Sequence, residues 1–593
     1  MKIKNGRSYK KNGWTYISVS GKPKERGFAY GYYCAEQFKE IQKMLHFYIF
    51  ESFGFTWDYF IKKINDDFKE MTKTQYLDLY LEMEGIAEGC NAAGCKTSID
   101  EIIAWNFYYS LPYWFSFISD THTGKEGGGK NKSSQSFIPL PRKNNASDKC
   151  SAFIAVGDWT TDGKIVVGHN SFCDFIDGQY CDVILDIQPF NGYRIIMQTC
   201  PCFIWSGTDF FVTTAGIIGT ETTIGGFQPY EKKIPIAYRI RTAMQYASNI
   251  DEYLSILTNG DSGDYANSWL IADIKTNEIA RIELGLKYFS VHRTKNGYLT
   301  GFNAPFDPRI RNIEVENSGF YDIRRHQGAR RVRLEELMKK YKGKINIEIA
   351  KKILADHYDV YLKKNNNPCS RTVCSHYDLD AREYMSQSDR PFPYSPRGAV
   401  DGMVCDTTLA ENMSFIGRYG NSCGMPFNKD KFCKEHMQYS NICKFLKDRP
   451  SQPWTKFQVH NFNKTSFNQY LNDTKKQVKI IANILDNKNL FQDIELNDID
   501  KAFEVDDIHI KRIFYTNKDI NYIPNNKLIQ SVSNNKYKKD QDNISNKLNN
   551  EKKNEKKILK TRYLKNFKNK TKKNRTKKIE QTKQNKTKQN KTK

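Results

Sequence analysis

Residues 150–170 read CSAFIAVGDWTTDGKIVVGHN, and this stretch decides the fold class. The apolar run 150–156 predicts a strand, and 164–168 predicts a second strand that returns beside it. Between them, Asp162-Gly163 is a strong signal for a hairpin turn of two residues. The stretch therefore predicts a buried antiparallel hairpin.

The turn also predicts which residues of the hairpin lie opposite one another. If Asp162 and Gly163 form the whole turn, Phe175 lies opposite Cys150 and Asp174 lies next to it. The residues from His169 onward would then pass close to the Cys150 sulfur. The hairpin thus predicts a cluster of polar side chains beside a cysteine.

On either side of the hairpin, strands and helices occur in separate groups. A strand is predicted at 14–19, followed by mostly helical spacing as far as residue 113. Further strands are predicted at 183–187, 193–199, 210–214, 268–274, 279–284 and 288–292. Helices are predicted at 238–247, 250–258, 329–341 and 345–355. Clustered strands with segregated helices favour an α+β fold over a doubly wound parallel sheet.

Composition divides the 593-residue chain into four parts. We expect an N-terminal helical part and linker at 1–149, a core at 150–454, an extension at 455–535, and a disordered Lys/Asn-rich tail at 536–593. The tail holds 23 Lys or Arg against 5 Asp or Glu, so most of the formal charge of +25 lies there. The body is only slightly basic, which argues against a specific nucleic-acid-binding domain. The tail is either a solvated extension or a peripheral contact to an anionic membrane.

Targeting and cysteine patterns exclude further classes. Residues 1–21 lack the continuous apolar stretch of a secretory signal, so no conventional export signal is predicted. No run of 18 apolar residues occurs, which argues against a transmembrane helix. The 14 cysteines include no CxxC pair, so we expect reduced structural thiols, no metal site and no cofactor.

Cys150 has two interpretations from position alone. It is either one more small core residue or, if the Lys149–Cys150 bond is cut, an N-terminal nucleophile. A thiol beside a free α-amine carries its own base, because that amine titrates near neutral pH. Spacing does not decide between these interpretations.

A set of motifs occurs in order along the chain. The motifs are CSAFIA (150–155), TDGKIVVGHN (161–170), WSGTDF (205–210), ETT (221–223), YANSWL (265–270), RIELG (281–285), ADHY (355–358), RTVCSH (371–376) and GAVDGMV (398–404). This ordered set resembles the phospholipase B-like family, within the N-terminal-nucleophile hydrolases related to self-cleaving penicillin acyltransferases. The resemblance runs from about residue 14 to about residue 454.

The resemblance implies a four-layer αββα sandwich that matures by cutting the Lys149–Cys150 bond, with Cys150 as nucleophile. It implies that the Asn267 amide contributes to an oxyanion hole, a role that suits a neutral donor. His169 and Asn170 are implied to line the site, with His169 orienting groups near the amine. Structural interpretations remain open for both: Asn267 as a residue that ends a turn, and His169 as a hydrogen-bonded core residue.

Other residues are weaker candidates for binding substrate. Asp174 follows from the predicted pairing, Arg371 would hold a phosphate or carboxylate, and Asp209 would bind the new ammonium group. Salt bridges explain Arg371 and Asp209 equally well. The Arg pairs at 324–325 and 330–331 are interpreted as the solvated start of a helix.

The leading hypothesis is a hydrolase that removes fatty acyl groups from glycerophospholipids through a Cys150 thioester. Its partner would be a lipid or an acylated small molecule. The alternatives are an amidase or acyltransferase acting on N-acyl amino compounds, and a non-catalytic lipid-binding protein. The chain departs from the family pattern in having Lys149 before the nucleophile and in lacking an evident signal peptide, although animal relatives are lysosomal or secreted.

Overall fold

The computed structural model describes residues 3–123, 150–207, 210–381 and 393–462. Contacts divide the chain into Met1–Lys479 and Ile480–Lys593, and every described residue lies in the first unit. The predicted tail at 536–593 and most of the predicted extension lie outside the described residues. The following account concerns the first unit.

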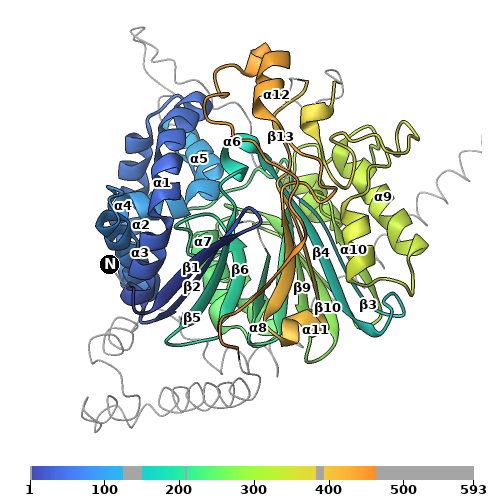
Figure 1. The fold of residues 1–593 in the computed structure, drawn as a ribbon, viewed down its shortest axis with the longest axis horizontal. Coiled ribbons are helices and arrows are strands. Elements are labelled where there is room, and N and C mark those ends of the chain that lie inside the picture. The colour runs from blue at the N-terminus through green and yellow to red at the C-terminus, as the bar shows by residue number, and fades with distance from the viewer. Residues whose placement is uncertain (1–2, 124–149, 208–209, 382–392, 463–593) are drawn as a thin grey trace, which may run out of the picture. The chain divides into compact units, whose positions relative to one another are not determined.

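Two β-sheets form the centre of this unit (Figure 1). The larger sheet has nine strands, and β2 runs parallel to β5 while the other neighbours that pair are antiparallel. Its order is β1 (Gly6–Lys11), β2 (Trp14–Gly21), β5 (Val183–Pro189), β6 (Ile195–Thr199), β7 (Phe210–Thr213), β8 (Ile217–Thr223), β9 (Asn267–Asp273), β10 (Glu278–Leu284) and β11 (Phe289–Thr294).

The second sheet contains the predicted hairpin and is antiparallel throughout. Its order is β12 (Gly297–Gly301), β3 (Cys150–Gly157), β4 (Gly163–Asp174), β14 (Asp401–Asp406), β15 (Ser414–Tyr419) and β16 (Thr455–Gln458), with β13 (Arg397–Ala399) paired to β4.

Strand β3 is buried on both of its faces. Ala152 and Ile154 pack in the core between the two sheets, whereas Phe153 and Ala155 pack against the helices behind the second sheet. Burial on both faces explains why β3 reads as a continuous apolar run rather than an alternating one.

Helices cover the outer faces of both sheets (Figure 1). Over the nine-stranded sheet, the Phe211 ring of β7 stacks on Tyr253 of α8 at 6.0 Å, and over the other sheet Ile353 and Leu354 of α10 pack against β3 and β4. The helices are α1 (Pro23–Phe53), α2 (Trp57–Gln75), α3 (Leu77–Ala92), α4 (Ile99–Asn106), α5 (Leu111–Thr123), α6 (Phe175–Gly178), α7 (Ile236–Tyr246), α8 (Ile250–Thr258), α9 (His326–Lys340), α10 (Ile347–Leu354), α11 (Thr407–Glu411) and α12 (Lys429–Glu435). The four-layer αββα prediction is confirmed. In the described part of the chain, no helix combines the length and apolarity needed to cross a bilayer.

The register of the hairpin differs from the prediction. Cys150 lies opposite Ser171 rather than Phe175, and a bulge interrupts the pairing near Gly157. The connection is residues 158–162, because β3 ends at Gly157 and β4 begins at Gly163. Within it, the Asp162 carboxylate accepts a hydrogen bond from the Lys164 amide. Prediction of a two-residue turn was therefore wrong.

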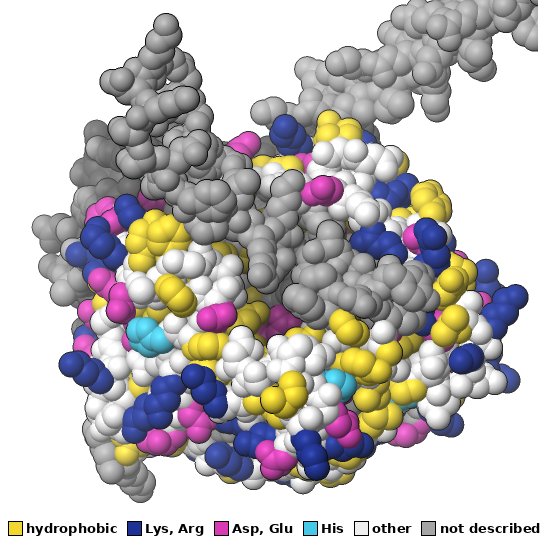
Figure 2. Space-filling model, turned by 90° about the horizontal axis from the view of Figure 1, so that it is seen from above, with side chains coloured by type: hydrophobic (Ala, Val, Ile, Leu, Met, Phe, Trp, Pro, Cys, Tyr) yellow, Lys and Arg dark blue, Asp and Glu magenta, His cyan; other side chains and the backbone are white. Residues whose placement is uncertain are grey.

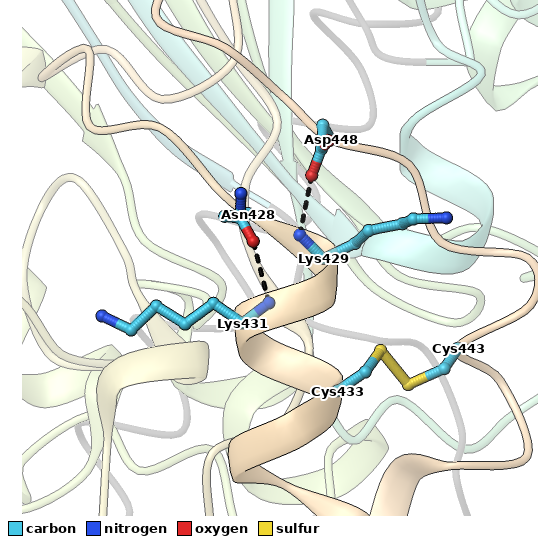
Figure 3. Close-up of a disulfide and its surroundings, with 6 residues drawn as sticks. All are labelled: Asn428, Lys429, Lys431, Cys433, Cys443 and Asp448. Carbon is cyan, nitrogen blue, oxygen red and sulfur yellow. Dashed lines mark hydrogen bonds between the residues drawn. A yellow bond between two sulfur atoms is a disulfide. The ribbon is translucent and has the colours of Figure 1, made fainter.

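A disulfide between Cys433 and Cys443 corrects the expectation that the thiols are reduced (Figure 3). It ties α12 to the segment that follows it. Asn428 caps the start of the helix, because its side chain accepts a hydrogen bond from the Lys431 amide, and the Lys429 amide donates to Asp448. Figure 3 shows both contacts beside the disulfide, so this small helix is fixed at both of its ends.

Charged side chains of both signs are interspersed on the face seen in Figure 2, where basic groups are dark blue and acidic groups magenta. This distribution agrees with a body that carries little of the chain's net charge.

Inside the unit, Glu82 of α3 is fully buried and accepts hydrogen bonds from Arg26 of α1 and Arg241 of α7. Burial alone opposes ionisation of Glu82, but Arg241 and Arg26 outweigh it and lower the pKa of this carboxyl group. One carboxylate therefore links three helices.

Helices α1 and α3 pack with their backbones in contact. A Cβ atom added at Gly31 would lie 2.0 Å from the carbonyl oxygen of Ile86. One added at Gly89 would lie 2.0 Å from that of Phe28. Similar contacts exist at Gly27 and Gly85. Glycine is required at these positions because no side chain fits between the two helices.

Replacing Gly31 with Ala should push α1 and α3 apart. We expect the free energy of unfolding to fall by about 1–3 kcal/mol, as in other overpacked cores. Urea titration of the purified variant measures this. The control is Glu36→Ala on the exposed face of α1, which should change stability by no more than about 0.5 kcal/mol. Equal stability of the two variants would contradict the close packing.

Candidate active site

Cys150 is the first described residue after the gap at 124–149 and the first residue of β3. It alternates with Ala152 and Ile154, so its side chain is on the side of β3 that faces the other sheet. The residue is 2% exposed, and its sulfur lies 3.9 Å from Oε1 of Glu221 in β8. The thiol thus lies between the two sheets, beside a carboxyl group. Lys149 lies outside the described residues.

The backbone of Cys150 is held at both its nitrogen and its oxygen. Its N–H donates to Oδ1 of Asn303 at 3.3 Å, and its carbonyl oxygen accepts a hydrogen bond from the Arg330 guanidinium. Asn303 also accepts a hydrogen bond from Arg330 at 2.7 Å and donates to the Thr223 carbonyl at 2.7 Å. Asn303 therefore connects the cysteine, α9 and the end of β8.

Arg330 is fully buried, which corrects its interpretation as part of a solvated helix start. Besides Cys150 and Asn303, it donates to the Ser151 hydroxyl at 3.1 Å and contacts Nδ1 of His326 at 2.8 Å. The sequence did contain a signal for the burial of Arg330. Position 330 follows the helical spacing of the buried residues 326, 327, 329, 334, 337 and 338 of α9, so it belongs to the packed face.

Glu221 is completely buried on β8. Its Oε1 accepts a hydrogen bond from the Tyr265 hydroxyl at 3.0 Å, and the Thr223 hydroxyl lies 3.4 Å from the same oxygen. These contacts fix the carboxyl group beside Cys150. Sequence reasoning noted the motif that begins at Glu221 but assigned no role to this side chain.

His169 lies on β4 opposite Ala152, on the same side of the sheet as Cys150. Its ring is 0% exposed and stacks on Phe210, with centroids 6.3 Å apart. Neither ring nitrogen has a hydrogen-bond partner of normal geometry among the described residues. Burial lowers the pKa of His169 to about 3, against a smaller opposing effect of the Glu221 backbone. His169 is therefore neutral near pH 7.

Asn267 is the first residue of β9 and is also fully buried. It lies opposite Thr223 of β8, whose carbonyl oxygen binds Asn303. The register thus brings Asn267 to the end of β8 that carries Glu221.

The predicted substrate-binding residues are placed differently. Asn170 is on the opposite side of β4 from His169, and its amide donates to the carbonyl oxygens of Leu354 and Val373 at 2.9 and 3.0 Å. The Ser422 hydroxyl donates to its Oδ1. The Asn170 side chain therefore joins loops behind the second sheet.

Asp174 and Arg371 are held in ion pairs. Asp174 lies opposite Arg397, which contacts it at 3.0 Å, and it is not next to the residue opposite Cys150 as predicted. Arg371 is 1% exposed, and its Nε lies 2.9 Å from Oδ1 of Asp359. Asp209 lies outside the described residues.

Asp401 supports the strand beside the cysteine. Its Oδ1 accepts a hydrogen bond from the amide of Ser171, the residue opposite Cys150, and its Oδ2 accepts one from Gln198. Burial raises the pKa of Asp401 to about 7, although both hydrogen bonds act in the opposite direction.

This raised pKa predicts how stability depends on pH. An unfolded Asp has a pKa of about 3.9, so between about pH 4 and pH 7 the folded state binds the extra proton at Asp401. The contribution of Asp401 to stability is therefore largest at low pH and is lost at up to about 1.4 kcal/mol per pH unit as pH rises toward 7.

Asp401→Asn should remove this contribution. Urea unfolding of wild type and variant from about pH 4 to pH 8 should show the variant gaining stability relative to wild type as pH rises, with a plateau above about pH 7. All other titratable groups are the same in both proteins, so their contributions cancel in the difference between the two free energies of unfolding. A difference that is constant over the whole range would show that Asp401 has an ordinary pKa.

Comparisons with known proteins agree with the motifs. The family model described as phospholipase B matches residues 30–474. Phospholipase B of Crotalus adamanteus is 28% identical over 286 residues, which are 42% of this chain and 48% of that protein. Phospholipase B-like 1 of Homo sapiens is 25% identical over 277 residues, 41% of this chain and 46% of that protein. The matched region thus spans about half the length of these curated relatives.

Among solved structures, a variant of conjugated bile acid hydrolase from Clostridium perfringens matches with 10% identity and a TM-score of 0.23. The match covers 54% of this chain and 93% of that one. A score this low carries no inference about the present chain. The family model, in contrast, covers most of the sequence. The chain therefore belongs to the phospholipase B family.

Proposed function

We propose that this protein is a hydrolase that removes fatty acyl groups from glycerophospholipids, with Cys150 as an N-terminal nucleophile after the Lys149–Cys150 bond is cut. Family membership supports hydrolysis, and the names of the relatives suggest phospholipid as substrate. The observation that carries the proposal is the position of Cys150. It begins a buried strand, its nitrogen is held by Asn303, and its sulfur lies beside Glu221.

The hydrogen bond to Asn303 suits both states of the chain. Before cleavage, the Cys150 nitrogen is an amide that donates to Oδ1 of Asn303. After cleavage, the same nitrogen becomes an α-amine that still donates to this oxygen. The hydrogen bond from Arg330 to the Cys150 carbonyl fixes the other end of the residue. The nucleophile and its base would therefore keep their positions through maturation.

The reaction would proceed in two halves. The α-amine takes the thiol proton, and the sulfur attacks the ester carbonyl carbon. The Asn267 amide and backbone N–H groups stabilise the oxyanion. The tetrahedral intermediate then collapses, the ammonium group protonates the departing alcohol, and an acyl thioester remains on Cys150. Water, deprotonated by the amine, cleaves the thioester to release the fatty acid and restore the thiol.

Two nearby groups would position the reacting atoms. The Glu221 carboxyl group lies 3.9 Å from the sulfur of Cys150 and accepts a hydrogen bond from the thiol, so it would orient the nucleophile. His169 is neutral above its pKa of about 3, so we assign it an orienting role. A neutral imidazole donates at one nitrogen and accepts at the other, which suits that role.

Maturation is tested by denaturing electrophoresis with N-terminal sequencing. Wild type should give two fragments, of which the larger starts Cys-Ser-Ala-Phe, whereas Cys150→Ala should give one band. The control is Cys405→Ser, which replaces a buried thiol of β14 whose contacts are to backbone oxygens, and it should still be cut. An uncut wild type that nevertheless turns over acyl substrates would refute the mechanism.

Substrate class is tested with two substrates that carry the same acyl chain, a phosphatidylcholine and an N-acyl glycine, with free fatty acid as the readout. The processed protein should release fatty acid from the ester, and Cys150→Ala should lower the rate by at least about 10³-fold. If free fatty acid is released from the amide alone, the substrate class is N-acyl amino compounds and not phospholipids. Binding of both without release would indicate a non-catalytic protein, and full activity of Cys150→Ala would exclude this nucleophile.

A further inference from the structure

Four side chains with metal-binding atoms converge behind the second sheet, outside the candidate active site. They are His357, Cys374, His376 and Cys423, and their ligand atoms all lie within 4.8 Å of one another. They come from three separate segments: the loop after α10, the segment before β13, and the loop after β15. Cys374 and His376 are buried, and the other two are half-buried.

The distances between these atoms match a tetrahedral arrangement. Nε2 of His357 lies 3.2 Å from Nε2 of His376, and the sulfurs of Cys374 and Cys423 each lie 3.5 Å from the latter atom. Zinc bonds of about 2.0–2.1 Å to nitrogen and about 2.3 Å to sulfur give tetrahedral edges of roughly 3.4 Å between nitrogens and 3.6 Å between nitrogen and sulfur. A single cation therefore fits among the four atoms.

The outer nitrogens of both rings face oxygen atoms. Nδ1 of His357 lies 3.3 Å from Oδ1 of Asn366, and Nδ1 of His376 lies 3.8 Å from the carboxylate of Asp378. An oxygen at Nδ1 favours the tautomer with its proton there, which leaves the Nε2 lone pair free toward the cluster. Histidines that bind metals usually have such a partner on their second nitrogen.

We propose that His357, Cys374, His376 and Cys423 bind one thiophilic divalent cation, zinc in the first instance. Two thiolates and two imidazoles are a ligand set that zinc prefers, and four protein ligands make a closed, structural site. The inference is independent of the proposed hydrolase activity, because the metal is measured directly and not through turnover.

The cation would join the loops that surround Asn170. The Asn170 side chain binds the carbonyl oxygens of Leu354 and Val373 and the hydroxyl of Ser422. These residues lie in or directly next to the three segments that supply the ligands. The metal would therefore stabilise the support behind β4 without taking part in chemistry at the sulfur of Cys150.

The direct test is elemental analysis of the full-length protein after equilibration with Zn²⁺ and removal of loosely bound metal by gel filtration. We expect about one zinc per chain in wild type, and a loss of at least about tenfold in Cys423→Ser and in His376→Ala. The matched control is Cys369→Ser, a buried thiol nearby that contacts Asp359 rather than the cluster, and it should retain the zinc. Wild type without zinc would overturn the proposal.

A second measurement keeps the test valid if a variant fails to fold. Wild type equilibrated with Co²⁺ should show the intense visible bands of a tetrahedral site and a thiolate charge-transfer band in the near ultraviolet. Chelation of the zinc-bound protein should lower its midpoint of thermal unfolding, because a cation that binds the folded state stabilises it. Octahedral cobalt spectra, or peptide mapping that finds a Cys374–Cys423 disulfide, would overturn the proposal.

Discussion

The hydrogen bonds of Asn303 are the contact on which the candidate site depends. One carboxamide accepts from the Cys150 nitrogen and from Arg330, and donates to the Thr223 carbonyl at the end of β8. It thereby links a strand of each sheet and a helix of the outer layer. If this side chain were lost, the buried partners would be left without compensation, which costs about 1–3 kcal/mol for each unsatisfied group. The position of the sulfur is thus set by polar contacts inside a mostly apolar core.

Buried arginines repeat this arrangement elsewhere in the unit. Arg26 and Arg241 meet on Glu82 between three helices, Arg330 holds the Cys150 backbone, and Arg371 pairs with Asp359. A guanidinium group offers several donors in a fixed plane, so one side chain can hold segments from different layers. Burying a guanidinium group costs free energy of desolvation unless the group has hydrogen-bond or charge partners. This requirement restricts how the layers can pack.

Local patterns predicted an α+β arrangement, and the family resemblance implied its four layers, but neither predicted the contacts between the layers. The apolar run of β3 and the return strand were readable because both strands are buried on two faces. The register of the hairpin could not be predicted, because the connection before Gly163 is longer than the Asp-Gly signal suggests. A change in the length of the connection shifts every pair of residues that lie opposite one another. Cys150 was identified from family motifs, since position alone left two interpretations open.

The residues that sequence reasoning missed act through distant neighbours. Asn303 reaches Cys150 because β12 pairs with β3, and Glu221 reaches it because the two sheets pack face to face. No local spacing encodes either contact. Arg330 was misread because a pair of arginines resembles a solvated surface, although its helical position lies on the packed face. The cluster around His376 was missed for a related reason. Its members are spread from residue 357 to residue 423 and contain no close pair of cysteines.

The parallel pairing of β2 with β5 bears on what a cut before Cys150 would produce. Strands β1 and β2 form one edge of the nine-stranded sheet, and α1 packs beside them, so the described residues upstream of the cut are part of the layers of the fold. The two pieces would form an obligate heterodimer encoded by one gene. They would migrate together through native chromatography and separate only when the sheet itself is unfolded.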